Sequence, residues 1–340
     1  MNLQEIAASL NVSPAAVSIV RSGKPGVSAL TRRRIQIALE ENGYPFQEFR
    51  QPTPNAPPPP SEAQRYIQLL KFRRSSLLID KNEGFVDAII DAIDLRASSE
   101  RYTLTLKSVS PEEYPAFLQS MDIGRCLGLL VIATEMERAD ICALSKLNMP
   151  LVILDSDHPD LPFSTVTMDN RGLAYRAVSH LLETGGGEVG YVTSAIRTGN
   201  FVGRANGYRE ALADHGRPWR AENVFTLTPS LQNAHADMRR LLSEGRRVPE
   251  ALFAENDVLA IGAMRGLLEA GYRIPGDVRV IGVDNTPLSQ IVSPTLSTMQ
   301  ISRSALGQQA FSALLRQTAS PGGEPVHVRL SSRLILRESG

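Results

Sequence analysis

The chain has 340 residues, of which 42% are hydrophobic and 21% charged, and its 36 basic residues balance 36 acidic ones. This length predicts about two or three domains with cores large enough to fold without disulfides. The only cysteines, Cys126 and Cys142, lack the paired spacing of a zinc or redox motif. We therefore expect no metal site and no cofactor.

Apolar runs such as 127–133 are much shorter than the roughly 20 residues that span a bilayer. The N-terminus also lacks the basic and apolar segments of an export signal. These features predict a soluble, cytoplasmic protein without a membrane partner.

The first 39 residues carry five basic side chains against Glu5 alone, a net charge of +4, which leaves −4 for the remainder. A local basic patch of this kind attracts phosphate groups. Apolar residues at helical spacing predict a helix over 3–9, and the Ser-Pro pair at 13–14 is a typical start for a second helix over 14–21. Ser28 would cap a third helix. Two short helices joined by a tight turn and braced by a third predict a helix-turn-helix.

Residues 51–60 read QPTPNAPPPP, which contains six prolines in ten. This composition favours an extended polyproline conformation and is typical of a linker. The sequence therefore divides into an all-α head over 1–50, a Pro-rich linker over 51–62 and a larger body over 63–340.

The body alternates apolar strands with amphipathic helices, as in a parallel sheet covered on both faces. The pattern starts again near residue 170, so we expect an α/β body of two doubly wound lobes with a ligand cleft where the carboxyl ends of their strands meet. Strands are predicted at 66–71, 103–107, 127–132, 151–154, 189–192, 224–226, 251–254 and 279–283. Helices are predicted at 85–99, 171–184, 202–215, 234–244, 258–270 and 303–318.

Several motifs occur in a recognisable order along nearly the whole chain. They are Ile6-Ala7, Asn11-Val12-Ser13, Val17-Ser18 and Gly43-Tyr44 in the head, and Asp169-Asn170, RANGYREAL at 204–212, FAENDVLAIGAMRGLLEAGYRIPGDVRVIGVDN at 253–285 and SPTLSTM at 293–299 in the body. Together they resemble the LacI/GalR family of bacterial transcriptional regulators.

The resemblance implies a body like a periplasmic binding protein, in which the chain crosses between the lobes three times. The first lobe would comprise about 63–166 and 298–324, and the second about 167–297 and 325–340. The helix from Arg303 would return to the first lobe, and the last strand, near 328–336, would lie in the second. The chain stops where the family core ends, which implies a homodimer without the helix that makes some members tetramers.

The resemblance also implies that the second helix enters the major groove of operator DNA. The family usually has polar side chains there, including an Arg after the Val-Ser pair, where this chain has Ile19. Ala15 and Ile19 can contact thymine methyl groups, whereas Ser18 and Arg21 can reach polar base edges or phosphates. The basic run 32–34 could instead be a solvated helix face. The expected DNA-binding residues are Ser13, Ala15, Ala16, Ser18, Ile19, Arg21, Lys24 and Arg32.

The hinge departs from the family pattern as well. The family has a short helix with a Leu that wedges into the minor groove, but here Tyr44 is followed by PFQEFR and then by prolines. Phe46 or Phe49 could serve as the wedge or could pack on the head. We therefore expect effector binding to act on DNA through the spacing of heads on a semi-rigid tether.

The body is expected to bind a small sugar-like effector between its lobes. Arginine and aspartate offer fixed donors and acceptors for hydroxyl groups, and an aromatic ring covers the apolar face of a sugar. Each candidate also has a structural alternative, since Arg204 could be an exposed helix-start residue, Asp284 could cap a turn, and Asn256 could cap the following helix. Phe85 could belong to the core. The resemblance places Arg204, Asn256 and Asp284 where family members contact a sugar or similar polyol. Asp155 follows a strand of the first lobe, and Asn82 and Phe85 lie in the loop after the first strand. The expected effector-binding residues are Asn82, Phe85, Asp155, Arg204, Asn256 and Asp284.

These features predict a DNA-binding transcriptional regulator, most simply a repressor, whose operator affinity is set by a small effector. A solute-binding protein without a DNA role is the first alternative, but it would need an export signal where this chain has a helix-turn-helix. A sugar-processing enzyme is the second, but no nucleophile elbow, HExxH pair or phosphate-binding lysine loop occurs in the sequence. We therefore expect a regulator that is not an enzyme.

Overall fold

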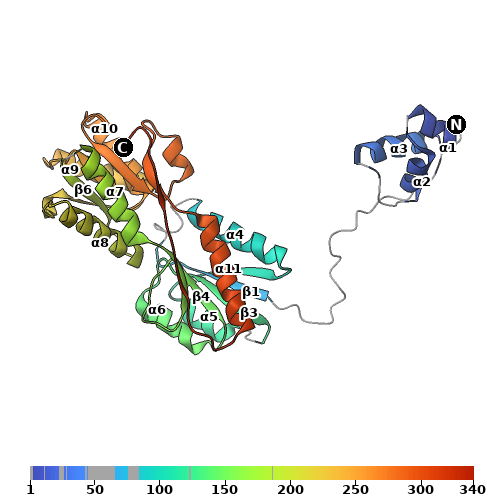
Figure 1. The fold of residues 1–340 in the computed structure, drawn as a ribbon, viewed down its shortest axis with the longest axis horizontal. Coiled ribbons are helices and arrows are strands. Elements are labelled where there is room, and N and C mark those ends of the chain that lie inside the picture. The colour runs from blue at the N-terminus through green and yellow to red at the C-terminus, as the bar shows by residue number, and fades with distance from the viewer. Residues whose placement is uncertain are drawn as a thin grey trace. The chain divides into compact units, whose positions relative to one another are not determined.

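A computed structural model describes residues 3–10, 12–22, 27, 29–42, 44, 66–75, 84–121, 124–185 and 187–340. The chain divides into two compact units, Met1–Ala63 and Gln64–Gly340 (Figure 1). Lys24, Phe46, Phe49, Asn82 and the linker expected over 51–62 lie outside the described residues. None of the helices described is both long and apolar enough to cross a membrane.

The head contains three helices, α1 (Leu3–Ser9), α2 (Pro14–Arg21) and α3 (Ala29–Glu41). The bounds predicted for the first two are confirmed. Ser13 caps α2, because its hydroxyl accepts a hydrogen bond from the backbone N–H of Ala16 at 3.2 Å. The three helices share a small apolar core, which fixes the angle between α1 and α2. That core consists of Ile6, Ala7, Val17, Val20, Ile35 and Leu39.

The first lobe of the body contains a six-stranded sheet in the order β11-β5-β4-β3-β1-β2, in which all neighbours are parallel. Its central strands are apolar on both faces, because helices cover both. The strands are β1 (Tyr66–Phe72), β2 (Thr103–Val109), β3 (Cys126–Ile132), β4 (Leu151–Leu154), β5 (Ser164–Met168) and β11 (His327–Leu330).

Alternate residues of this sheet enter two separate cores. Leu130 and Ile132 pack toward α4 (Phe85–Ser99) and α11 (Arg303–Ala319). Leu129 and Val131 pack toward α5 (Tyr114–Ser120), α6 (Arg138–Ala143) and the 3-10 helix Leu144–Lys146. This is the two-residue period expected of a strand covered on both sides.

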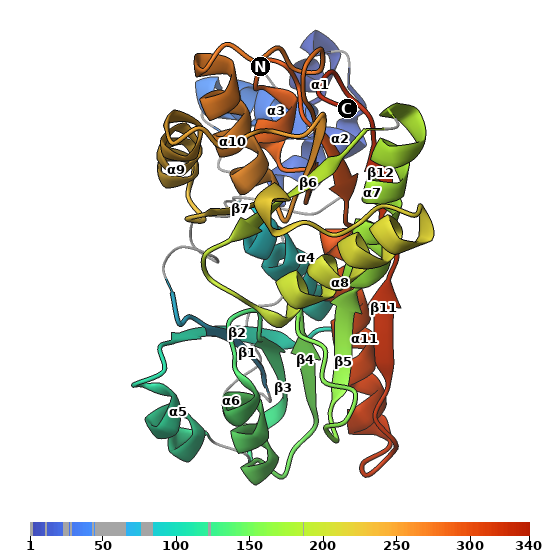
Figure 2. The same cartoon turned by 90° about the vertical axis from the view of Figure 1, so that its left-hand side faces the viewer.

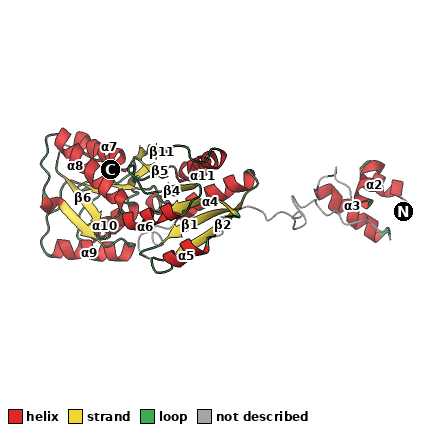
Figure 3. Cartoon of the chain, turned by 90° about the horizontal axis from the view of Figure 1, so that it is seen from below, coloured by secondary structure: helices red, strands yellow, loops and turns green. Residues whose placement is uncertain are grey.

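The second lobe contains a sheet in the order β12-β10-β9-β8-β6-β7, which is parallel except for its edge strand β12. Figure 3 shows α7 and α8 on one side of β6 and α9 on the other. The strands are β6 (Val189–Ser194), β7 (Val224–Leu227), β8 (Ala251–Ala254), β9 (Arg279–Val283), β10 (Ser297–Gln300) and β12 (Arg333–Ile335). The helices are α7 (Asn170–Gly185), α8 (Gly199–Asp214), α9 (Leu231–Ser243), α10 (Asp257–Glu269) and the 3-10 helices Ala221–Asn223 and Pro287–Gln290.

The chain crosses between the lobes at three places, after β5, after β10 and between β11 and β12 (Figure 2). The return of α11 to the first lobe is as expected, but two details of the expected boundaries are wrong. Residues 298–300 stay in the second lobe, because Thr298 and Met299 pair with β9. The single last strand expected near 328–336 is two strands, of which β11 completes the edge of the first sheet and only β12 joins the second.

Candidate functional site

A cavity of about 40 Å³ lies between the lobes, where strand carboxyl ends and helix amino ends of both sheets meet. Pockets for small molecules usually hold about 300 to 1,000 Å³, so a sugar-sized ligand requires the lobes to separate further than they do here. The first lobe contributes Phe85, Val86, Thr134, Asp155 and Met168. The second lobe contributes Thr198, Asn200, Phe201, Arg204, Asn256 and Asp284.

Two aspartates enter this cavity from equivalent positions of the two lobes. Asp155 is the first residue after β4, and Asp284 is the first residue after β9. Both have positive backbone φ angles, 58° for Asp155 and 113° for Asp284, and both side chains are buried. Non-glycine residues in such conformations cost about 1–3 kcal/mol and cluster at binding and catalytic sites. The strain at both positions makes this cavity the candidate functional site.

The carboxylate of Asp155 is only partly satisfied by the protein. Thr134 Oγ1 donates to Asp155 Oδ2 at 2.6 Å, whereas the buried Oδ1 has no hydrogen-bond partner among the described residues. Burial raises the pKa of Asp155 to about 6, and the nearby Asp284 adds to this, while the Thr134 hydroxyl and the Arg204 guanidinium oppose it. An orphaned acceptor in a cavity is a natural partner for a ligand hydroxyl.

Arg204 lies on the first turns of α8 and is 3% exposed, so it is not an exposed helix-start residue. Its Nε donates to Asn170 Oδ1 at 2.9 Å, and one terminal nitrogen donates to the backbone oxygen of Glu255. Its guanidinium also lies 5.4 Å from the ring centroid of Phe201. These contacts use only part of its five N–H donors and hold the guanidinium in one orientation against the cavity.

A pair of asparagines links the lobes beside Arg204. Asn200 Nδ2 donates to the backbone oxygen of Asp155 at 3.0 Å, and Asn170 Nδ2 donates to Asn200 Oδ1 at 2.8 Å. This hydrogen-bonded chain runs from the end of β4 in the first lobe to α7 and α8 in the second. Any ligand that separates the lobes must break or replace the bond between Asn200 and Asp155.

Asn256 caps a helix and also lies at the wall of the cavity. Its Oδ1 caps α10 by accepting a hydrogen bond from Leu259 N at 2.9 Å, and the residue also lines the cavity. Its neighbour Asp257 points away from the cavity and accepts hydrogen bonds from Thr286 and Thr298. Burial, with Asp284 adding to it, raises the pKa of Asp257 to about 7.

Five of the six expected effector residues therefore surround one cavity, namely Phe85, Asp155, Arg204, Asn256 and Asp284. Phe85 lines this cavity and also belongs to the first-lobe core. Sequence reasoning missed Thr134 and Asn200. Asn200 could have been found from Thr198, which caps α8, because Asn200 and Arg204 are then four residues apart on one helix face.

The head presents small side chains and one arginine on the exposed face of α2. Val17 and Val20 are buried, Ala16 and Ile19 are half-buried, and the remaining expected contact residues of this helix are exposed. Those exposed residues are Ser13, Ala15, Ser18 and Arg21. The side chain of Arg32 is outside the described set. On the same helix as Arg32, Arg34 donates to the backbone oxygen of Leu10 at 3.3 Å, so the basic run also braces the head.

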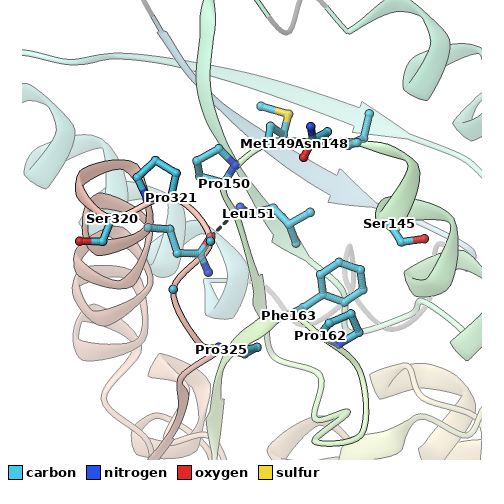
Figure 4. A pocket seen from close by; sticks show the side chains of 14 residues that line it. Ser145, Asn148, Met149, Pro150, Leu151, Pro162, Phe163, Ser320, Pro321 and Pro325 are labelled. Carbon is cyan, nitrogen blue, oxygen red and sulfur yellow. Dashed lines mark hydrogen bonds between the residues drawn. The ribbon is translucent and has the colours of Figure 1, made fainter.

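A larger cavity, of about 360 Å³, lies at the opposite end of the first lobe (Figure 4). It is formed near the amino ends of β4 and β5 and the end of α11, and its lining includes Pro150, Phe163 and Gln317. No ionisable side chain lines it, and it contains none of the expected effector residues. We favour the interlobe cavity because its polar groups converge from both lobes.

Comparison with known proteins agrees with this architecture. Residues 178–340 match the model of the periplasmic binding protein-like domain. The HTH-type transcriptional repressor PurR of Escherichia coli O139:H28 is 28% identical, over 99% of this chain and 96% of the relative. The transcriptional regulator CelR in its cellobiose complex superposes with a TM-score of 0.72 at 24% identity, and all of both chains is covered. A LacI family regulator from Enterococcus faecium with bound ribose superposes with a TM-score of 0.67 at 25% identity, over 80% of this chain and 98% of that one.

Proposed function

We propose that the chain is a repressor of the LacI/GalR type whose operator affinity is controlled by a sugar or sugar derivative. The observation that carries the effector part is the convergence of Asp155, Arg204 and Asp284, from both lobes, on one cavity. The relatives are regulators, and we expect this protein to bind its effector without turning it over.

The DNA-binding part of the proposal rests on the head. An exposed helix with Ser18 and Arg21 on its surface, capped by Ser13 and braced by α1 and α3, suits insertion into a major groove. We expect that deletion of residues 1–60 abolishes binding to an operator selected from random duplex DNA and leaves effector binding intact. Fluorescence anisotropy with labelled duplex tests this expectation. Unchanged DNA affinity would show that the head does not bind the DNA.

The effector class is proposed from the chemistry of the cavity. Asp155 and Asp284 accept hydrogen bonds, Arg204 and Asn256 donate them, and Phe85 and Phe201 supply aromatic surface, which together suit a ring with several hydroxyl groups. The ribose bound to the Enterococcus faecium relative supports this class. A thermal-shift screen of sugars, sugar phosphates and nucleosides identifies the ligand, because a compound that binds only the folded state raises the melting temperature. Operator titration with and without the hit then shows whether it releases or recruits the repressor.

We propose that the working form is a homodimer that reads a nearly palindromic operator, since two heads then enter successive major grooves. The exposed apolar side chains Leu95 on α4 and Leu106 on the edge strand β2 favour the first lobe as part of the dimer face. Effector binding between the lobes would shift the dimer between two states that differ in head spacing. A ligand that binds without changing operator affinity would contradict this coupling.

A further inference from the structure

A cavity of about 310 Å³ lies within the second lobe, between the sheet and α8. It is formed by β6, β7, the middle of α8 and the loop that follows α8, and it shares no lining residue with the interlobe cavity. Its floor consists of buried side chains, including Tyr191, Ser194 and Tyr208, and its rim is exposed. The residues on the rim decide what it can bind.

Aromatic rings form two sides of this cavity. Trp219, the only tryptophan of the chain, lines it with 49% of its surface exposed. The rings of Tyr191 and Tyr208 are stacked with centroids 4.8 Å apart. A half-exposed indole beside a cavity offers a flat apolar face that a ring-shaped ligand can cover. Arg209 already stacks on this indole, with its guanidinium carbon 5.9 Å from the ring centroid.

The charges around the cavity are unbalanced in favour of cations. Arg197 and Arg209 both line it. Arg197 forms an ion pair at 2.6 Å with Glu255, whose buried carboxylate also accepts from Tyr191 Oη at 2.5 Å and from Ser194 N at 2.6 Å. Arg209, in contrast, has no carboxylate partner among the residues that the structure describes. One positive charge therefore remains at the rim, on a planar group suited to a carboxylate or phosphate.

We propose that this cavity is a second ligand site, which binds a small ring compound that carries a carboxylate or a phosphate. The ring lies against Trp219, the anion contacts Arg209 and Arg197, and the hydroxyls of Thr193 and Thr226 reach its polar edge. Glu255 holds Arg197 and Tyr191 in place from below. Its backbone oxygen also accepts from Arg204, so the same residue touches both sites.

Isothermal titration calorimetry of the full chain tests this proposal with AMP as a ring phosphate and 4-hydroxybenzoate as a ring carboxylate. We expect at least one of them to bind, and Arg209→Gln and Trp219→Leu each to weaken that binding about tenfold or more, as loss of a charge-assisted contact or a stacking face does. Both side chains are exposed, so the variants should keep the melting temperature of the parent. Arg239→Gln, an exposed arginine of α9 that does not line the cavity, is the matched control and should bind as the parent does.

Three results would overturn the proposal. The first is that neither probe binds. The second is that inorganic phosphate binds as tightly as AMP and the Trp219 variant binds AMP normally, which would show that the ring makes no contact with the site. The third is that Asp284→Asn abolishes probe binding while Arg209→Gln leaves it unchanged, which would assign the probe to the interlobe cavity. The titration does not involve DNA. A failure of the proposed repressor function would therefore appear in the operator assay and leave this result standing.

Discussion

Asp155, the candidate binding residue at the end of β4, reduces the stability of the fold that holds it. Its backbone has a left-handed φ of 58°, its Oδ1 is buried without a partner among the described residues, and its carboxylate is ionised only at a cost. Each of these features is unfavourable in the protein alone and becomes useful only when a ligand donates to the carboxylate. The residue therefore gives a direct test of the site.

We predict that Asp155→Asn stabilises the protein at pH 8 and weakens effector binding. Because burial raises the pKa of Asp155 to about 6 in the folded state, the folded protein keeps a proton that the unfolded chain releases above pH 4. The contribution of Asp155 to stability therefore falls between about pH 4 and pH 6 and stays low above. The variant should gain about 1–3 kcal/mol at pH 8 and nothing at pH 4.

Urea unfolding of parent and variant across this pH range measures the difference. The pKa of Asp257 is raised to about 7, so this residue also makes the free energy of unfolding depend on pH. Its contribution is the same in parent and variant and cancels when their free energies of unfolding are subtracted. Asp277→Asn is the matched control, because Arg273 holds the pKa of Asp277 at about 2 and its titration is complete below this window. A variant with the same pH profile as the parent would show that Asp155 does not titrate in the folded protein.

At the scale of residues, the sequence can predict those cavity residues that belong to a recognisable strand end or motif. Asp155 was predictable because the strand before it is a continuous apolar run, which fixes where that strand ends. Asp284 was predictable because it lies in the motif at 253–285 that carries the family resemblance. Asn200 was not predictable in the same way. Its role depends on a hydrogen bond to the backbone of Asp155 across the cleft, and nothing in the local sequence records how the two lobes meet.

At the scale of elements, polar strands escaped prediction. β5 (Ser164–Met168) is fully buried, although three of its five side chains carry hydroxyls. Two of these hydroxyls have distant partners, since Ser164 Oγ accepts from Gln317 Nε2 at 2.7 Å and Thr165 Oγ1 lies 2.9 Å from His327 Nδ1. A pattern of apolar residues cannot reveal a strand whose buried hydroxyls find partners on α11 and β11, more than 150 residues later.

The contact between α7 and α8 positions Asn170 and Arg204, and it depends on a glycine. A Cβ atom added to Gly207 would lie 2.0 Å from the backbone oxygen of Arg171. We predict that Gly207→Ala destabilises the protein by about 1–3 kcal/mol, because α8 must move away from α7. Gly199→Ala, at the open start of the same helix, meets nothing within 4 Å and should be neutral or slightly stabilising.

Thermal or urea unfolding of the two glycine variants makes the comparison. The displacement of α8 should also lower effector affinity in Gly207→Ala, since Arg204 moves with the helix. Equal stability of the two variants would mean that α7 and α8 can separate at little cost.

Two residues of helix α2 allow non-specific contacts with phosphate to be distinguished from sequence-specific contacts with bases. Arg21 is exposed and Ile19 is half-buried. We expect Arg21→Gln to weaken binding to all duplexes alike and to reduce the slope of log affinity against log salt by about 0.9, as loss of one phosphate contact does. Ile19→Ala should instead cost about 1–3 kcal/mol on the selected operator only, because a methyl contact is specific to thymine.

Anisotropy titrations at several salt concentrations, on the operator and on an unrelated duplex, distinguish the two effects. A change of salt slope in the Ile19 variant, or an effect of Arg21→Gln on the operator alone, would reverse these assignments. Loss of both activities in either variant would indicate that the head no longer folds.

At the scale of the whole molecule, the proposed dimer explains why two apolar side chains stay exposed on the first lobe. Leu95 is 74% exposed on α4 and Leu106 is 50% exposed on β2, which is the edge strand of its sheet. An unprotected edge strand with an apolar neighbour is a liability unless another surface covers it. A second copy of the chain would cover both leucines and bring two heads into one complex.

We therefore predict that Leu95→Asp shifts the protein to monomers and lowers operator affinity by about a hundredfold or more, because each head then binds its half-site without the other. Effector binding should persist, since the interlobe cavity lies within one chain. Val326→Asp is the matched control, an exposed apolar residue beside β11 at the opposite edge of the same sheet. Sedimentation of both variants with and without operator measures the effect. A dimeric Leu95→Asp protein with normal operator affinity would exclude this face and require another surface to set the spacing of the heads.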